Sequence, residues 1–260
     1  MSLTYSSYLK VHELLSLQEA RSDGPEHDEM LFIIIHQVYE LWFKEMLHEM
    51  DFLCGKLVEN DHWRALHTFR RVLTILKVAV RQIDILETMT PIEFLTFRNR
   101  LDSASGFQSY QFRELEFALG YKRQGIFEFY ADDPVAYQKM KKRYDAPTLW
   151  DAFLHYLSLN EYAIPKEILQ RDVTQPIDPS PEIQKILLNV YHGNAAAGRV
   201  CERMVDLDEG LQEWRYRHVK MVERTIGTKQ GTGGSSGTQY LKGTLFKPFF
   251  PDLWAIRAEL

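Results

Sequence analysis

The sequence predicts an all-α fold, a helical bundle joined by short loops. Apolar residues recur at helical spacing, no long stretch alternates with a period of two, and several helix starts carry capping residues. At 260 residues the chain can bury a sizeable core. No internal repeat or composition break divides it, so residues 1–260 are expected to form a single domain.

Two long helices are predicted in the first third of the chain. Residues 26–57 form the first, and its segment Leu31–Ile35 is apolar on every side, as expected of a fully buried stretch at the centre of the bundle. The second is an amphipathic helix of about 25 residues. Its apolar positions at helical spacing are Trp63, Leu66, Phe69, Leu73, Leu76, Val80 and Ile83.

Capping residues predict the later helices. Thr90 and Glu93 can form a capping box with Pro91 at the first helical position, and this helix should end near residues 103–106. Ser180-Pro181 begins a helix that runs toward Leu207, and residues 209–226 form the next one.

Composition excludes several classes of protein. The net charge of -5 provides no basic field for a phosphate backbone, so nucleic acid is not an expected partner. The N-terminus lacks a basic stretch followed by an apolar core, and no run of about 18 apolar residues occurs, so neither export nor a membrane span is expected. Cys54 and Cys201 cannot build a disulfide framework. A cytoplasmic protein fits these observations.

Two histidines lie on apolar helical faces. His36 is in line with Phe32 and Tyr39, and His218 follows Trp214 by one turn. Singly, each is more often a satisfied core histidine than a ligand. Together they indicate a buried iron site, because neutral imidazole is the usual ligand of haem iron in oxygen-handling proteins. The residues themselves leave open which histidine binds the metal.

Other candidate groups have simpler alternatives. A carboxylate di-iron bundle needs a Glu-x-x-His pair on each of two helices, and Glu45–His48 is the one pair with that spacing inside a predicted helix. Arg98 lies one turn beyond Phe94 and could grip a carboxylate, although a surface salt bridge is the commoner role. The glycine-rich segment 231–237 could close over polar ligand groups or be a plain hairpin, but it has no GK[ST] phosphate-loop sequence.

Short motifs occur in order over more than 230 residues. They are Tyr5-Ser-Ser-Tyr8-Leu, HisAspGluMet at 27–30, Phe32-x-x-x-His36, LeuGluThrMetThrPro at 86–91, Phe97-Arg98 before SerGlyPheGlnSer at 105–109, Trp214-Arg-Tyr-Arg-His218, and GlyThrGlyGlySerSerGly at 231–237. In this order and spacing the chain resembles the tryptophan 2,3-dioxygenase family of the kynurenine pathway from end to end.

The resemblance implies a non-covalently bound haem b, ferrous in the active form, with His218 as the axial ligand of the iron. His36, the implied catalytic residue, would hydrogen-bond the indole N–H of L-tryptophan and orient it. Arg98 would hold the substrate carboxylate, and Thr232 with a haem propionate would hold the ammonium group. The implied substrate contacts are Phe32, Ile33, Ile34, Ile35, His36, Phe94, Arg98, Thr232, Tyr5 and Tyr8.

The implied reaction inserts both atoms of O2 across the indole C2–C3 bond and gives N-formylkynurenine, the first step of tryptophan catabolism. Two alternatives stay open: a paralogous haem enzyme that monooxygenates an indole or another aromatic substrate, and a haem-binding sensor without turnover. A sensor would be expected to carry a signalling or DNA-binding domain, which the sequence does not show.

The resemblance also implies a homotetramer, a dimer of dimers. Residues 1–20 would form an arm that carries Tyr5 and Tyr8 into a neighbour's active site. Two positions depart from relatives. Phe94 stands where many bacterial members have tyrosine, so one hydroxyl contact is lost, and Ile83 replaces an aromatic residue on the implied proximal side.

Overall fold

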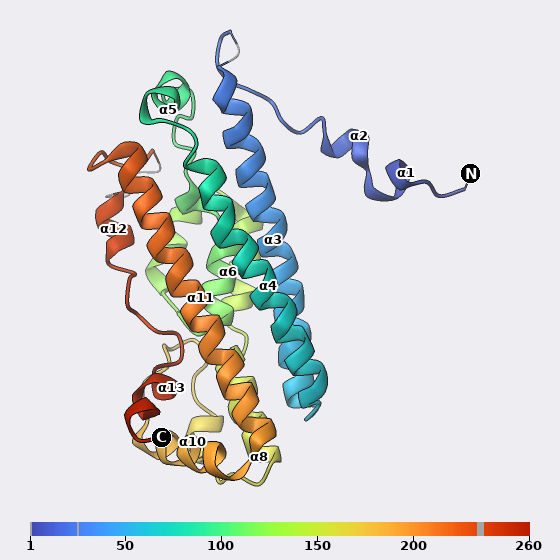
Figure 1. Ribbon diagram of the computed structural model, residues 1–260, viewed down its shortest axis with the longest axis vertical. Helices are drawn as coiled ribbons and strands as arrows, with labels where there is room; N and C mark the ends of the chain where they lie inside the picture. Colours follow the sequence, from blue (N-terminus) through green and yellow to red (C-terminus); the bar gives the residue numbers. More distant parts are fainter. Residues whose placement is uncertain (1, 25, 233–236) are drawn as a thin grey trace.

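Three long helices form the body of the protein, seen here in a computed structural model that describes residues 2–24, 26–232 and 237–260. They are α3 (His27–Val58), α4 (His62–Leu86) and α11 (Ala195–Ile226), and both α3 and α11 pack along α4 (Figure 1). The described residues contain no strand, and the predicted all-α fold is confirmed.

The first two long helices match their predictions. α3 begins within one residue of the expected start, and α4 has the expected length of 25 residues. Between them the chain reverses at Asn60, which adopts a positive φ of 58°. Asp61 then caps α4 by accepting a hydrogen bond from the backbone N–H of Arg64, so the turn and the cap together set α4 back along α3.

The predicted break between the last two long helices was wrong. The chain forms α10 (Pro181–Gly193) and then α11 without interruption through residues 207–209. The break occurs at Asn194, whose side chain accepts hydrogen bonds from the N–H groups of Ala196 and Ala197 and so starts a new helix. Asp208 lies inside α11, where it accepts hydrogen bonds from the backbone N–H groups of Phe249 and Phe250.

The helix α5 (Pro91–Arg98) begins as predicted and ends early. Its capping box between Thr90 and Glu93 is present, but the helix stops at Arg98 rather than near 103–106. The other α-helices are α1 (Tyr5–Leu9), α2 (Val11–Leu14), α6 (Tyr110–Ala118), α7 (Pro134–Tyr144), α8 (Leu149–Leu159), α9 (Lys166–Leu169), α12 (Thr238–Lys242) and α13 (Pro251–Ala255). Short 3-10 helices cover Gly106–Gln108, Gln124–Tyr130 and Ile256–Ala258.

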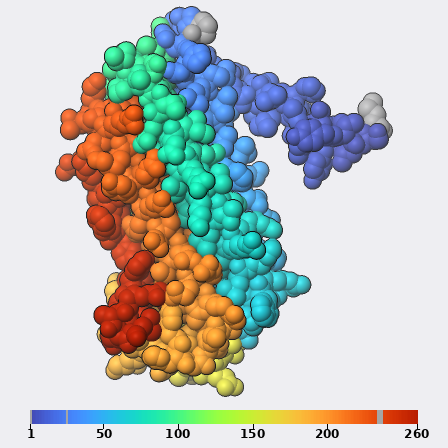
Figure 2. All heavy atoms as spheres, in the orientation of Figure 1, coloured from blue at the N-terminus to red at the C-terminus, as the bar shows by residue number. Residues whose placement is uncertain are grey.

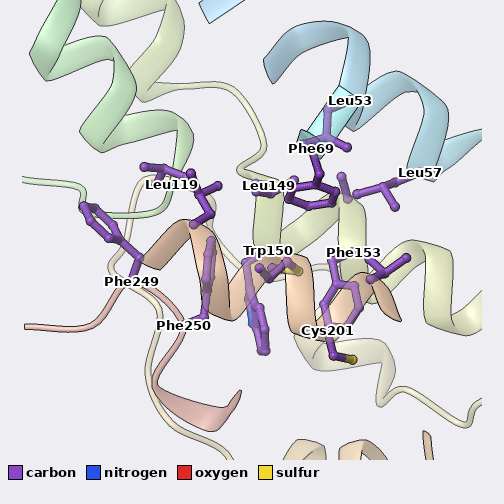
Figure 3. Packing of buried hydrophobic residues seen from close by; sticks show 14 of the residues in the cluster. Leu53, Leu57, Phe69, Leu119, Leu149, Trp150, Phe153, Cys201, Phe249 and Phe250 are labelled. Carbon is purple, nitrogen blue, oxygen red and sulfur yellow. The ribbon is translucent and has the colours of Figure 1, made fainter. Parts of the chain in front are cut away.

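The apolar core is concentrated at one end of the bundle. Phe69, Phe153 and Phe250 are fully buried there with Trp150, and the surrounding side chains come from α3, α4, α8 and α11 (Figure 3). A smaller cluster containing Ile35, Ile83 and Phe97 lies toward α5. The dense end anchors the long helices and leaves their other ends to shape a cavity.

The expectation that Leu31–Ile35 is fully buried was wrong. Ile35 is buried at 4% exposure, but Ile34 is 43% exposed. The neighbours of α3 are α4, α5, α6 and α8, and Ile34 is on a part of the helix surface that these neighbours leave exposed. Within 2–24, 26–232 and 237–260, no helix is long and apolar enough to cross a membrane.

Candidate functional site

A large cavity lies between α3, α4, α5, α6 and α11, near the α5 end of the bundle. It encloses about 1620 Å³, counting the space at its open mouth. Both histidines singled out in the sequence line it: His36 from α3 and His218 from α11.

His218 presents an unpaired imidazole to this cavity. Its ring is stacked on Trp214, with centroids 5.0 Å apart and planes 9° from parallel. Among the described residues, no side chain or backbone group makes a hydrogen bond to it. Burial, with smaller contributions from the nearby His36 and Arg113, lowers the pKa of His218 to about 4. The imidazole is therefore neutral at pH 7 and has a nitrogen lone pair available for a metal.

His36 has a different hydrogen-bonding state. Its Nδ1 lies 2.7 Å from the backbone oxygen of Phe32. A carbonyl can only accept, so Nδ1 carries the proton and donates it. Burial lowers the pKa of His36 although the Phe32 carbonyl and Glu40 act in the opposite direction. The ring is neutral at pH 7, which leaves Nε2 as an acceptor.

Aromatic rings form the wall beside His36. The Phe32 ring lies 4.2 Å from the His36 ring and 5.7 Å from the Phe94 ring, measured between centroids. Phe97 packs edge-on against Phe94 at 5.4 Å. Ile83, 1% exposed, also lines the cavity. Phe94 and Ile83, the two positions expected from the resemblance to differ from relatives, thus both line the cavity.

Arg98 and Thr232 lie on the cavity lining and connect two segments of chain. Arg98 Nη2 donates to the backbone oxygen of Gln230 at 2.7 Å, and Thr232 Oγ1 donates to the oxygen of Ala104 at 2.5 Å. The chain after α11 is thereby attached to α5 and the turn that follows it. Residues 233–236 lie outside the described residues, so the predicted closure of loop 231–237 over a ligand stays a prediction.

Comparison with known proteins identifies the family. The family model described as tryptophan 2,3-dioxygenase matches residues 1–149 and 182–260. The chain belongs to the tryptophan 2,3-dioxygenase family. The protein of that name from Herpetosiphon aurantiacus is 64% identical over 259 residues, which cover all of this chain and 99% of the relative. Those from Anaeromyxobacter sp. (strain K) and Bacillus thuringiensis are 52% and 41% identical, over all of this chain and 97% and 93% of the relatives.

Some residues that the resemblance to tryptophan 2,3-dioxygenases implicates lie away from the cavity of their own chain. Ile33, Ile34 and Ile35 are not part of its lining, because the helix turns them away from the side that carries Phe32 and His36. Tyr5 and Tyr8 are 76% and 70% exposed on α1, in the segment that projects from the body (Figure 2).

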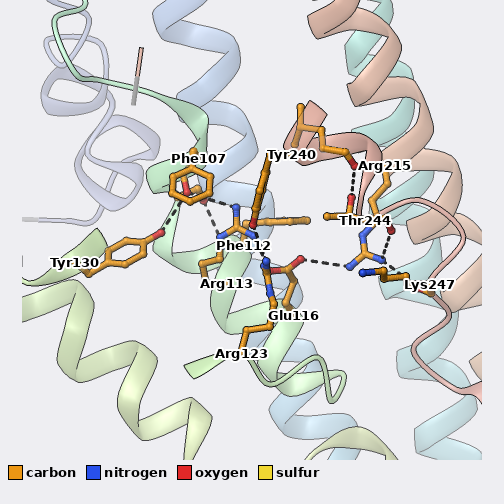
Figure 4. A network of polar contacts seen from close by, with 12 residues as sticks. Phe107, Phe112, Arg113, Glu116, Arg123, Tyr130, Arg215, Tyr240, Thr244 and Lys247 are labelled. Atoms are coloured by element: carbon orange, nitrogen blue, oxygen red, sulfur yellow. Dashed lines mark hydrogen bonds and ion pairs between the residues drawn. The ribbon is translucent and has the colours of Figure 1, made fainter. Parts of the chain in front are cut away.

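A buried charge cluster beside the cavity was not predicted from the sequence. Glu116, 2% exposed, pairs with Arg113 at 2.6 Å, Arg123 at 2.7 Å and Arg215 at 3.3 Å (Figure 4). Burial would raise the pKa of Glu116, but the three guanidinium groups hold it below its usual value. Three positive charges against one negative charge leave this cluster with a net charge of +2.

Two members of the cluster, Arg113 and Arg215, line the cavity. A sequence signal existed only for Arg215, which lies inside the Trp214–His218 motif. Among the residues that the structure describes, no group of three or more His, Cys, Asp or Glu side chains could hold a metal ion, and the Glu45–His48 pair gains no such companions.

Proposed function

We propose that this chain is a haem-dependent dioxygenase that inserts both atoms of O2 across the indole C2–C3 bond of L-tryptophan and releases N-formylkynurenine, the first step of tryptophan catabolism by the kynurenine pathway. One observation carries the proposal beyond family membership. Two neutral imidazoles line one cavity, and the Nδ1–H of His36 donates to Phe32, whereas His218 has no hydrogen-bond partner among the described residues. Their unequal hydrogen bonding supports unequal roles.

The residues around His218 fit a haem. A neutral, unpaired imidazole in an apolar wall is the ligand that haem iron takes in oxygen-handling proteins. The haem, when bound, supplies the ferrous iron at which O2 reacts with the substrate. The chain holds the ring nitrogen of His218 in place through the Trp214 stack and the long helix α11.

The charged wall fits the two carboxylates of haem b. The cluster around Glu116 carries a net charge of +2, and Arg113 lines the cavity with a buried Nε–H that has no partner in the described part of the chain. Trp214, which also lines the cavity, has a buried indole N–H to which no described residue offers an acceptor. Buried donors of this kind are costly unless an acceptor is supplied. We therefore assign Arg113 and Trp214 to the haem carboxylates.

Haem dimethyl ester, which has no carboxylate charge, is expected to bind the wild-type apoprotein at least tenfold more weakly than haem b, because charge-assisted hydrogen bonds contribute about 1.5–3 kcal/mol each. Spectroscopic titration measures both affinities. Trp214→Phe should weaken haem b binding and leave ester binding nearly unchanged. The matched control is Trp42→Phe, which removes another buried, unpartnered indole N–H that does not line the cavity. Equal affinities of the wild type for the two haems would contradict the assignment.

The part of the cavity lining around His36 fits the substrate. His36 Nε2 is free to accept the indole N–H, and Phe32 lies beside it to pack on the indole ring. The guanidinium of Arg98 would hold the carboxylate, and Thr232 with a haem propionate would hold the ammonium group. Because these groups would fix the indole in a cavity lined mostly by apolar side chains, the protein contributes orientation of the substrate. His36 orients the substrate and is not required as a base.

Arg98→Met is expected to raise the KM for L-tryptophan about 10- to 100-fold, because a charged hydrogen bond to the carboxylate is lost. Steady-state kinetics measure the change, and haem content should stay that of the wild type. Arg203→Met is the control, since Arg203 pairs with Asp206 on α11 and is not part of the cavity lining. An unchanged KM in Arg98→Met would show that Arg98 does not bind the substrate carboxylate.

The reaction itself is tested by product mass. The reduced, haem-loaded protein is given L-tryptophan and O2, and the product should be heavier than the substrate by two oxygen atoms. A product heavier by one oxygen atom would instead establish the monooxygenase alternative. Haem binding without consumption of tryptophan would instead support the alternative of a haem-binding sensor without turnover.

We also propose that the protein is a cytoplasmic homotetramer, a dimer of dimers, in which the chain forms one domain and residues 1–20 are an arm that reaches a neighbouring active site. The strong exposure of Tyr5 and Tyr8 on a projecting segment supports this assembly (Figure 2). Light scattering coupled to size exclusion tests it, and a monomer in solution would refute it.

A further inference from the structure

The HisAspGluMet motif at 27–30 includes a buried carboxylate that takes no part in the cavity described above. Glu29, in the first turn of α3, is 1% exposed. Its carboxylate accepts hydrogen bonds from the backbone N–H of Arg21 at 2.6 Å, from the N–H of Ser22 at 3.0 Å and from the Ser22 hydroxyl. The Ser22 oxygen in turn accepts the N–H of Glu26 at 3.3 Å. We call Glu29 with residues 21 and 22 the clasp.

The clasp depends on a charged carboxylate. Burial would raise the pKa of Glu29, but the hydrogen bonds from Ser22 and Arg21 and the charge of Arg100 outweigh burial and lower it. Glu29 is therefore ionised at neutral pH and accepts all three donors at once. A carboxamide at this position would present an NH2 group to backbone donors that need an acceptor.

A second attachment lies two turns further along the same face of α3. Gln37 Nε2 donates to the backbone oxygen of Leu17 at 3.0 Å, and Gln18 Nε2 donates to Gln37 Oε1 at 2.6 Å. Gln37 directly follows His36 in the sequence. Residues 17–22 are thus attached to α3 at both ends, whereas no described residue from 2 to 16 is buried. The helices α1 and α2 project from the bundle (Figure 1). Two separate points of attachment hold residues 17–22 in one orientation relative to α3.

We propose that Glu29 is a positioning residue that fixes the direction in which the N-terminal arm leaves the bundle, and thereby presents Tyr5 and Tyr8 to the cavity of a neighbouring subunit. This inference rests on the proposed function, in which the arm completes that cavity. When the clasp opens, the base of the arm is free to pivot, and the effective concentration of the two tyrosines at the neighbour's cavity falls.

Glu29→Gln tests the proposal in the haem-loaded oligomer. We expect the KM for L-tryptophan to rise about tenfold, with little change in kcat, because the arm is still present but is held in place for less of the time. Haem content and absorption spectrum should match the wild type, and trypsin should cleave the arm at Lys10 and Arg21 faster.

Glu49→Gln is the matched control. Glu49 lies on the same helix, is 5% exposed and pairs with Arg71 rather than with the arm. This variant is expected to lose stability without any change in KM or in cleavage of the arm. Ser22→Ala removes one of the three donors to Glu29. This variant should raise KM and speed cleavage of the arm, as Glu29→Gln does, but by less. It replaces Glu29→Gln in the test if Glu29→Gln folds poorly.

A double-mutant cycle separates action through the arm from a general structural effect. In a background with both Tyr5 and Tyr8 changed to alanine, Glu29→Gln should change KM by less than about twofold, because the arm no longer has side chains to deliver. A full tenfold effect in that background would overturn the inference. If the tyrosine changes raise KM and Glu29→Gln does not, the clasp inference fails and the proposed function stands. If the tyrosine changes themselves leave KM unaltered, the arm's proposed role fails.

Discussion

His218→Ala is expected to give a folded protein that retains almost no haem. The substitution removes the one unpaired imidazole that α11 presents to the cavity. No described hydrogen-bond donor or acceptor loses a partner, so the apoprotein should keep most of its stability; the main loss is the stacking contact with Trp214. Haem content per chain, measured as the pyridine haemochrome, checks the binding, and circular dichroism checks the fold.

His36→Ala is the informative comparison for this experiment. It removes an imidazole from the same cavity but should leave haem content unchanged and lose only part of the activity, because His36 orients the indole and does not hold the iron. Full haem retention in His218→Ala would show that the axial ligand is misassigned. Loss of haem in both variants would point to collapse of the cavity.

Glu116→Gln is expected to cause the largest loss of stability. Removing one partner from a buried ion cluster leaves uncompensated charge and costs about 3–5 kcal/mol. Three guanidinium groups would remain next to each other, with Arg113 and Arg215 almost fully buried. For a chain of this size the loss corresponds to a fall in Tm of about 10 °C. Thermal unfolding followed by circular dichroism measures it.

The pH dependence gives this prediction a second test. The pKa of Glu116 is held below its ordinary value of 4.5, so its contribution to stability is present above that pH and is lost as the pH falls through the lowered pKa. The variant should therefore lose less stability than the wild type below pH 4.5. Glu114→Gln is the control: burial raises the pKa of Glu114, so neutralising it should cost little. An equal fall in Tm for both variants would contradict the special role of Glu116.

The long helices could be predicted because their causes are local. The 3.6-residue periodicity of α4 and the capping box of Thr90 and Glu93 are visible in the chain itself. The break at Asn194 was missed because small alanines follow it and the helical pattern continues on both sides. The exposure of Ile34 depends on which neighbours cover α3, and no window of sequence contains that information.

In the candidate site, too, some residues could be predicted from the sequence and others could not. His36 and His218 were found because each lies on an apolar helical face beside an aromatic residue. The cluster around Glu116 was not found, because its arginines come from separate segments and only tertiary packing brings them together among the many charged residues of the chain. The contacts of Glu29 likewise join α3 to a preceding loop without regular structure.

The uninterrupted course of α11 has a mechanical consequence. Asp208 attaches one part of this helix to the C-terminal segment, because its carboxylate accepts hydrogen bonds from the backbone N–H groups of Phe249 and Phe250 and from the indole N–H of Trp254. Ten residues further on, from 208 to 218, about 15 Å of rigid helix ends at His218. Each residue added to the helix between these points moves His218 by about 1.5 Å along the helix axis and rotates it by about 100° around that axis. Any insertion or deletion of one residue between these points would swing the His218 imidazole out of the cavity that it shares with His36, however well the rest of the bundle folded.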